Sequence, residues 1–302
     1  MPAMTQAIGL AAPALAAPRP ASRSAARLAD LAVDALIAEA HLTPKPALVD
    51  GRGSGAHADL DLPTMVRSAN ALRPTFTAMA EAAEGIEPGR RLRELLGAIG
   101  RRGERDMLAA TGGSNAHRGA IWVLGLFIAA AVGGSRGDAG ELAGRVAGLA
   151  CISDGHAPDG GSHGLRACGR YGVAGARGEA MSGFPAVVRV GLPMLRRARD
   201  RGLGRDEGML DSLMAIMAML DDTCLLHRGG RRALAAAKDG AAAVLAAGGT
   251  STPAGLSALA SLDAELLAMN ASPGGSADML AASIFLDWLG VQPARSFAFG
   301  SG

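Results

Sequence analysis

The stretch of sequence that decides the fold runs from Gly119 to Ser135 and reads GAIWVLGLFIAAAVGGS. None of its 17 residues is charged, and Gly and Ala are frequent in it. A span of this length is at the lower limit for crossing a bilayer. A helix that is apolar on every side is buried either in a membrane or in a protein core. We predict a buried core helix over residues 116–132 and no association with a membrane.

Amphipathic helices are predicted on both sides of this core helix. In residues 25–40 (AARLADLAVDALIAEA), apolar residues recur at steps of three and four, which is the helical period. Similar patterns predict helices over 63–83, bent near Pro74, and over 89–110, 138–152, 184–201, 206–220, 230–247, 253–269 and 276–289. No stretch shows the strict alternation of a strand, so the sequence predicts an all-α fold.

The chain of 302 residues is predicted to form a single globular multi-helix domain over residues 25–302. Residues 1–24 lack an early positive charge, and Pro13 and Pro18 break their apolar run. A secretory signal needs a basic start and an unbroken apolar centre. We therefore expect residues 1–24 to be a flexible N-terminal tail.

Composition narrows the class of protein. Hydrophobic residues make up 49% of the chain, so it can bury a sizeable core. The 30 basic residues against 28 acidic ones leave a net charge of +2, which argues against a protein that coats nucleic acid. The three cysteines are far apart and odd in number, which is not a disulfide framework. We predict a cytoplasmic protein with no nucleic-acid partner.

Polar and charged residues gather in Gly-rich loops between the predicted helices. These loops cover residues 45–61, 111–118, 174–183, 221–230 and 270–278. Glycine lets the backbone approach a ligand closely, and the free N–H groups of a helix N-terminus bind phosphate. Carboxylates on neighbouring loops would hold Mg²⁺ beside substrate phosphates. The arrangement predicts a site in which Gly-rich loops meet at the ends of helices.

The first of these loops carries candidate ligands for a phosphate and a metal ion. Lys45 is fixed between two prolines, so it is either a point charge for a phosphate or a solvent-exposed lysine in a stiff turn. Asp50, Asp59 and Asp61 follow in the same loop. Each offers oxygen ligands to Mg²⁺, or else caps a helix or a turn.

The second loop, TGGSNAHRGA over residues 111–120, runs directly into the core helix. It places Asn115, His117 and Arg118 at the N-terminus of that helix. Glycines, helix dipole and positive charge all favour an anion there. The alternative is a capped helix with solvated His and Arg side chains.

Five motifs in this order resemble the triphosphoribosyl-dephospho-CoA synthases. They are TPKPALVD (43–50), GAHADLD (55–61), TGGSNAHRGAI (111–121), GARGEAMSGFP (175–185) and SPGGSADMLAA (272–282). The resemblance spans residues 39–289. The chain has Ala47 where the family often has Gly, and Ser54 lies near a position at which the family often has Asn. It has Ala116 and Arg118 where Thr and Lys are common in the family. These mild departures leave the resemblance standing. Residues 268–289 are more similar to the malonate decarboxylase branch than to the citrate lyase branch.

The resemblance implies an all-α transferase. Such an enzyme joins the ribose C1 of ATP to a ribose hydroxyl of 3′-dephospho-CoA, releases adenine and keeps the triphosphate. The product, 2′-(5″-triphosphoribosyl)-3′-dephospho-CoA, is the precursor of the prosthetic group of an acyl carrier subunit. A further transferase would load it onto that subunit, which belongs to malonate decarboxylase or, as the alternative, to citrate lyase.

The chemistry implied by the resemblance assigns roles to the loops. Cleaving the N-glycosidic bond places positive charge on the ribose, and the incoming hydroxyl needs a carboxylate base. The candidate catalytic residues are Glu179 and Asp222, with an ion pair to Arg177 as the alternative role of Glu179. The triphosphate would be bound by Lys45, Ser54, Asn115, His117, Arg118 and Arg177. Mg²⁺ would be held by Asp50, Asp59, Asp61, Asp221 and Asp278, and the nucleotide or CoA by Arg228, Ser272, Gly274, Gly275 and Ser276.

Two of these assignments have a local reason. Asp221 and Asp222 end an apolar helix, where carboxylates oppose the dipole. A bound cation would compensate them, and Arg228 is the alternative. From its residues alone, the sequence SPGGSADM favours a plain turn with Ser276 as helix cap, and a phosphate cradle before a helix is the alternative that the resemblance supports.

Two other functions fit part of the pattern. An all-α, Mg²⁺-dependent N-glycoside hydrolase of the ADP-ribosyl-glycohydrolase kind would share the acidic loops without the Pro-Lys-Pro clamp. A non-catalytic helical scaffold would leave the five polar loops unexplained. A homodimer is considered for either enzyme.

Overall fold

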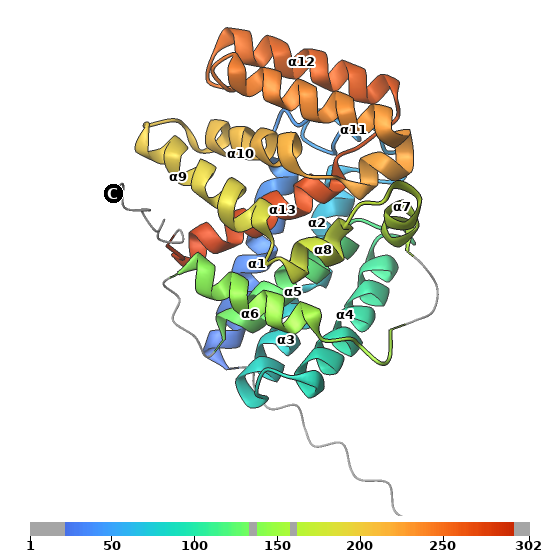
Figure 1. Ribbon diagram of the computed structural model, residues 1–302, viewed down its shortest axis with the longest axis vertical. Coiled ribbons are helices and arrows are strands. Elements are labelled where there is room, and N and C mark those ends of the chain that lie inside the picture. The colour runs from blue at the N-terminus through green and yellow to red at the C-terminus, as the bar shows by residue number, and fades with distance from the viewer. Residues whose placement is uncertain (1–21, 133–137, 158–161, 293–302) are drawn as a thin grey trace, which may run out of the picture.

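The computed structural model describes residues 22–132, 138–157 and 162–292. These residues form helices and contain no strand, which confirms the all-α fold. The helices are α1 (Arg23–His41), α2 (Leu62–Ala71), α3 (Arg73–Gly85), α4 (Arg90–Ala110), α5 (Arg118–Ala131), α6 (Ala139–Cys151), α7 (His163–Tyr171), α8 (Gly175–Met181), η1 (Ala186–Gly191), α9 (Leu192–Asp200), α10 (Arg205–Met219), α11 (Thr223–Ala246), α12 (Pro253–Ala268) and α13 (Gly274–Leu289) (Figure 1). Of the predicted tail, residues 1–21 lie outside the described residues, while Arg23 already belongs to α1.

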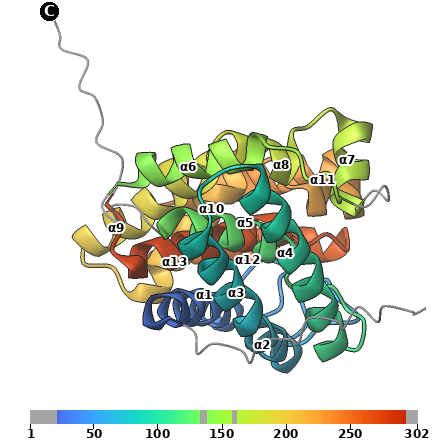
Figure 2. The ribbon, with the colours of Figure 1, turned by 90° about the horizontal axis from the view of Figure 1, so that it is seen from below.

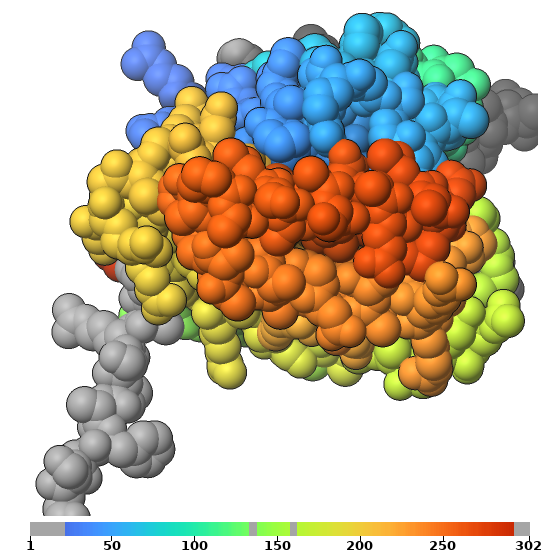
Figure 3. Space-filling view, turned by 90° about the horizontal axis from the view of Figure 1, so that it is seen from above, coloured from blue at the N-terminus to red at the C-terminus, as the bar shows by residue number. Residues whose placement is uncertain are grey.

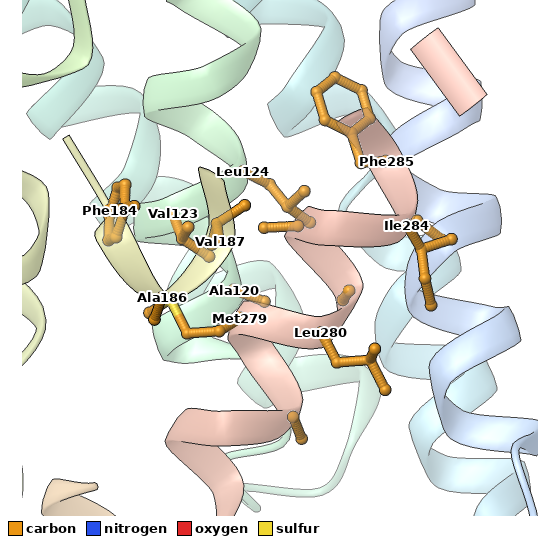
Figure 4. Packing of buried hydrophobic residues seen from close by; sticks show 14 of the residues in the cluster. Ala120, Val123, Leu124, Phe184, Ala186, Val187, Met279, Leu280, Ile284 and Phe285 are labelled. Atoms are coloured by element: carbon orange, nitrogen blue, oxygen red, sulfur yellow. The ribbon is translucent and has the colours of Figure 1, made fainter. Parts of the chain in front are cut away.

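Helix α5 is the predicted core helix, and it is buried from Val123 to Ala131. Helix α13 is buried in the same way from Met279 to Leu286. Figure 2 shows both helices between α6 and α8 on one side and α1 and α3 on the other. Their apolar side chains meet those of η1, as Leu124, Val187 and Met279 show in Figure 4. None of the helices in the described part of the chain is long and apolar enough to cross a membrane.

Three segments that lie outside the predicted helices are helical. Residues 174–183 contain α8, and α7 lies within the region between the predicted helices 138–152 and 184–201. Residues 223–229 belong to α11, which continues through a kink at Gly230, where φ is +66°. Glycine is a poor helix former, so its frequency hides these short helices from sequence patterns. The kink uses a conformation that glycine adopts without strain.

Two other predicted helices are divided. The segment 63–83 breaks at Leu72, two residues before Pro74, into α2 and α3. Proline removes a backbone donor and restricts the residue before it, so the predicted bend lies at this point. The segment 184–201 begins as the π-helical η1 before α9. In η1 the carbonyl of Gly191 accepts a hydrogen bond from the Ser212 hydroxyl at 3.1 Å.

The long loop between α1 and α2 lies against α12, as the blue and orange-red surfaces in Figure 3 show. Asp263 of α12 ties the loop down, because its carboxylate accepts a hydrogen bond from the Ala47 amide at 2.7 Å. The same carboxylate forms an ion pair with Arg52 at 2.7 Å. This anchoring holds the Pro-Lys-Pro motif against the body of the molecule.

Candidate functional site

One cavity of about 1230 Å³ lies between α1, α4, α5, α7, α8, α11 and α13. All five predicted loops contribute residues to its lining. The predicted site residues that line it are Lys45, Asp59, Asn115, His117, Arg118, Arg177, Arg228, Ser272, Gly274, Gly275 and Asp278. Ser54, Asp50, Asp61, Glu179, Asp221, Asp222 and Ser276 are not part of its lining.

Lys45 is buried in the cavity wall, with 1% of its side chain exposed. Its ammonium donates to the carboxylate of Glu39 at 2.6 Å and to the Glu39 carbonyl at 2.6 Å. Glu39, at the C-terminal end of α1, also lines the cavity. The alternative of a solvent-exposed lysine is therefore wrong. Because Glu39 neutralises the charge of Lys45, the role of Lys45 as a phosphate ligand remains a prediction.

Asp278 lies in the first turns of α13 and reaches the N-terminus of α5. Its carboxylate accepts a hydrogen bond from the Ala120 amide, and a Cβ added at Gly119 would collide with its Oδ2. Burial, together with Glu39 and Asp222, raises the pKa of Asp278 well above its usual value. Gly119 of the TGGSNAHRGA motif therefore permits a close contact between α5 and α13 at the cavity wall.

Asp222 is 1% exposed and caps two helices at once. Its carboxylate accepts hydrogen bonds from the Cys224 amide of α11 at 2.8 Å and from the Ser276 amide and hydroxyl of α13 at 2.7 and 2.9 Å. Burial raises its pKa, while the bonds from Ser276 lower it. The compensation that we expected from a bound cation or from Arg228 is supplied for Asp222 by two helix N-termini.

His117 precedes α5 and is 2% exposed. Its Nδ1 lies 2.7 Å from the hydroxyl of Ser68 in α2, whereas its Nε2 is buried in the cavity wall with no hydrogen-bond partner among the described residues. Burial, and then the charge of Lys45, lower the pKa of His117 to about 4. If the Ser68 hydroxyl donates to Nδ1, Nε2 carries the proton and can donate a hydrogen bond to a ligand.

The neutral state of His117 predicts a loss of stability in mild acid. Its pKa is about 4 when folded and 6.5 as the reference value, so the unfolded chain binds more protons between these values. Stability is therefore complete above pH 6.5 and falls as the pH drops toward 4. At pH 5 the contribution of His117 alone to this loss should be about 2 kcal/mol. Urea unfolding at pH 7.5 and pH 5 should show it, and His117→Gln should reduce it. An unchanged pH profile in that variant would contradict the assignment.

Another part of the cavity wall contains His57, Ser272 and Arg228. The Nε2 of His57 lies 2.9 Å from the Ser272 hydroxyl, and its Nδ1 lies 3.1 Å from an Arg228 nitrogen. Arg228 also donates to the Ala56 carbonyl at 2.9 Å. Burial, and then the charge of Arg228, lower the pKa of His57 to about 4. Arg228 is thus engaged by the 45–61 loop, and Asp222 has other partners.

The remaining predicted metal ligands differ in their surroundings. Asp50 is buried and held by Arg52, which lowers its pKa against the effect of burial. Asp61 is the N-cap of α2, and its carboxylate accepts a hydrogen bond from the Thr64 amide at 2.8 Å. Asp221 is exposed and paired with Lys238 at 2.6 Å. Asp59, at the cavity rim, is 3.9 Å from His57. The metal-ligand role of these residues remains a prediction.

Glu179 lies in α8 and its carboxylate accepts a hydrogen bond from the Ala186 amide at 3.2 Å, at the start of η1. Burial, and then Asp221, raise its pKa, which the bond from Ala186 lowers. In the described part of the chain Glu179 makes no ion pair with Arg177, so that alternative is wrong. Its catalytic role remains a prediction. Ser54 contributes its carbonyl to a turn, accepting a hydrogen bond from the His57 amide at 3.1 Å.

Several residues of the cavity wall have no signature in the sequence. Glu39 looks like one more polar residue on an amphipathic helix, and its pairing with Lys45 has no sequence signature. Arg93 and Asp154 lie on α4 and after α6, outside the five predicted loops. The absence of any motif around them explains why they were missed.

Comparison with known proteins identifies the family. The family model described as ATP:dephospho-CoA triphosphoribosyl transferase matches residues 25–296. A protein from Pseudomonas paraeruginosa, named "Probable 2-(5''-triphosphoribosyl)-3'-dephosphocoenzyme-A synthase", is 58% identical over 87% of this chain and 90% of its own length. A relative of the same name from Azotobacter vinelandii is 56% identical over 94% of this chain and 97% of its own. No solved structure matches significantly. The family model and the relatives cover most of the chain, which therefore belongs to the ATP:dephospho-CoA triphosphoribosyl transferase family.

Proposed function

We propose that the protein transfers the 5-triphosphoribosyl group of ATP to 3′-dephospho-CoA and releases adenine. The observation that supports this proposal is one cavity lined by residues from all five Gly-rich loops. Its volume of about 1230 Å³ exceeds that of a common small-ligand site, as two nucleotide-sized substrates require. The names of the close relatives describe the same product.

The residues of the cavity wall supply the groups that the reaction needs. The departing adenine must receive a proton or a hydrogen bond, and the neutral His117 offers a donor at Nε2 if Ser68 donates to Nδ1. The accepting hydroxyl needs a carboxylate base. Glu179 and Asp222 are our candidates for that base, although both lie behind the lining of the cavity. The bonds from Ser276 and Ala186 orient them.

Asp278 is the carboxylate that we propose for Mg²⁺ in the wall of the cavity. This ion uses one or two carboxylates together with substrate phosphates. The carboxylate of Asp278 lines the cavity and forms no ion pair with any described residue, unlike those of Asp50 and Asp221. Bound there beside ATP, the ion would neutralise phosphate charge. Asp278 and the rim residue Asp59 are therefore the predicted ligands that the fold leaves accessible.

The biological setting is also a proposal. The segment 268–289 supports the malonate decarboxylase branch, in which a further transferase would load the product onto an acyl carrier subunit. Cys151, Cys168 and Cys224 are free thiols, which fits a reducing cytoplasm. Loading assays with acyl carrier subunits of malonate decarboxylase and of citrate lyase would distinguish the two branches. Sedimentation would test the homodimer.

The reaction itself is tested by mass spectrometry. Incubation with ATP, Mg²⁺ and 3′-dephospho-CoA should produce triphosphoribosyl-dephospho-CoA and one adenine for each product formed. Adenine release should stop when dephospho-CoA is left out. It should also stop when a chelator removes Mg²⁺. Adenine release that ignores dephospho-CoA would instead support the N-glycoside hydrolase. Absence of both products would contradict the proposal.

A further inference from the structure

Arginine side chains from three helices meet at the end of the cavity formed by α4, α5 and α8. Arg93 and Arg101 lie on α4, Arg118 begins α5, and Arg177 lies on α8. All four line the cavity. Burial lowers the pKa of Arg93; the charge of Asp154 raises it, while those of Arg101 and Arg177 lower it further. We call these four residues the arginine cluster.

The structure holds Arg93 in place from two sides. Its guanidinium group lies over the ring of Trp122 at 5.0 Å, and the indole N–H of Trp122 donates to the Ala176 carbonyl at 3.2 Å. Asp154, with 3% of its side chain exposed, is 3.6 Å from Arg93 and 2.6 Å from Arg101. A stacked and ion-paired arginine loses little conformational freedom when it binds a ligand.

The arginine cluster has unused hydrogen-bond donors and unbalanced charge. The Nε atoms of Arg93 and Arg118 are buried and have no hydrogen-bond partner among the described residues. Among the described residues, the four guanidinium groups form ion pairs with two carboxylates: Asp154 pairs with Arg93 and Arg101, and Glu104 pairs with Arg118. Buried donors without partners are costly, so a ligand that accepts from them is favoured.

We propose that the arginine cluster is the subsite for the triphosphate chain of ATP, an inference that rests on the proposed function. The other candidate cations of the cavity already have partners. Lys45 is paired with Glu39, and Arg228 donates to the Ala56 carbonyl and lies 3.1 Å from His57. His117, with a pKa of about 4, carries no charge at neutral pH. The most anionic part of the two substrates therefore binds at the arginine cluster, where positive charge is in excess.

Calorimetry with inorganic tripolyphosphate, ATP and dephospho-CoA tests the subsite without requiring turnover. Arg93→Ala should weaken binding of tripolyphosphate and ATP by about 10- to 100-fold, the range for a charge-assisted hydrogen bond. Arg93→Lys keeps the charge but loses the planar stack, so an intermediate effect is expected. Arg177→Ala, at an exposed position without an ion pair among the described residues, serves as the variant that should fold normally. Arg102→Ala, on the outer face of α4 with 79% of its side chain exposed, is the matched control.

The outcomes separate this inference from the proposed function. Weaker tripolyphosphate and ATP binding in the Arg93 and Arg177 variants, with dephospho-CoA binding and the Arg102 variant unchanged, supports the subsite. Unchanged affinities overturn it, as does an equal effect at Arg102 or a loss confined to dephospho-CoA. If the wild-type protein binds tripolyphosphate through Arg93 but makes no product, the proposed function fails and the subsite stands.

Discussion

Replacing Lys45 by Met should lower the free energy of unfolding by about 3–5 kcal/mol, the cost of leaving one charge of a buried pair without its partner. The side chains of Lys45 and Glu39 are 1% and 4% exposed, and 2.6 Å separate Nζ from Oε1. A loss of this size is a large part of the free energy of unfolding of a typical domain, which is about 5–15 kcal/mol. Urea unfolding monitored by circular dichroism would measure it.

Two controls make the Lys45 result specific. Lys238 is the only other lysine of the chain, and its pair with Asp221 is exposed, so Lys238→Met should cost less than about 1 kcal/mol. The double variant Glu39→Leu with Lys45→Met removes both charges and should recover most of the stability. If Lys45→Met instead keeps the wild-type free energy of unfolding but binds ATP at least about tenfold more weakly, Lys45 is a phosphate ligand.

Replacing Asp222 by Asn should lower the free energy of unfolding by about 3 kcal/mol. The amide would point its NH₂ group at N–H donors that the carboxylate now accepts, which leaves two or more buried donors unpaired at about 1–3 kcal/mol each. The donors are the Cys224 amide and the amide and hydroxyl of Ser276. Gly275 and Asp278 lie in the first turns of α13, which Asp222 caps, and both line the cavity. Activity should therefore fall together with stability.

The neighbouring residue is the matched control for Asp222. Asp221 is half-exposed in its side chain, and Asp221→Asn loses a surface ion pair worth less than about 1 kcal/mol. Activity per folded molecule, measured below the melting temperature, separates structure from chemistry. If Asp222→Asn retains stability but loses turnover, Asp222 acts in the reaction itself. Equal stability of both variants would contradict the double cap.

The sequence determined the elements whose pattern is local. The charge-free run that forms α5 and the three- and four-residue steps of α1 predict helices because a helix buries one face or all faces by its own period. The five Gly-rich loops were also visible, since Gly, Asp, His and Arg stand out against Ala-rich helices. That these loops line one cavity follows from their common place at helix ends.

Only the tertiary structure decided which charges are free to bind a ligand. His117 lies 49 residues from Ser68 in sequence, and Asp222 lies 54 residues from Ser276. From the sequence, Lys45 is either a phosphate ligand or an exposed cation, yet it is buried and paired with Glu39. Arg93 carries no motif, yet the stack on Trp122 and the buried Asp154 place it in the cavity. Electrostatic free energy depends on distance and burial, which a sequence fixes only through the packing of segments that lie far apart along the chain.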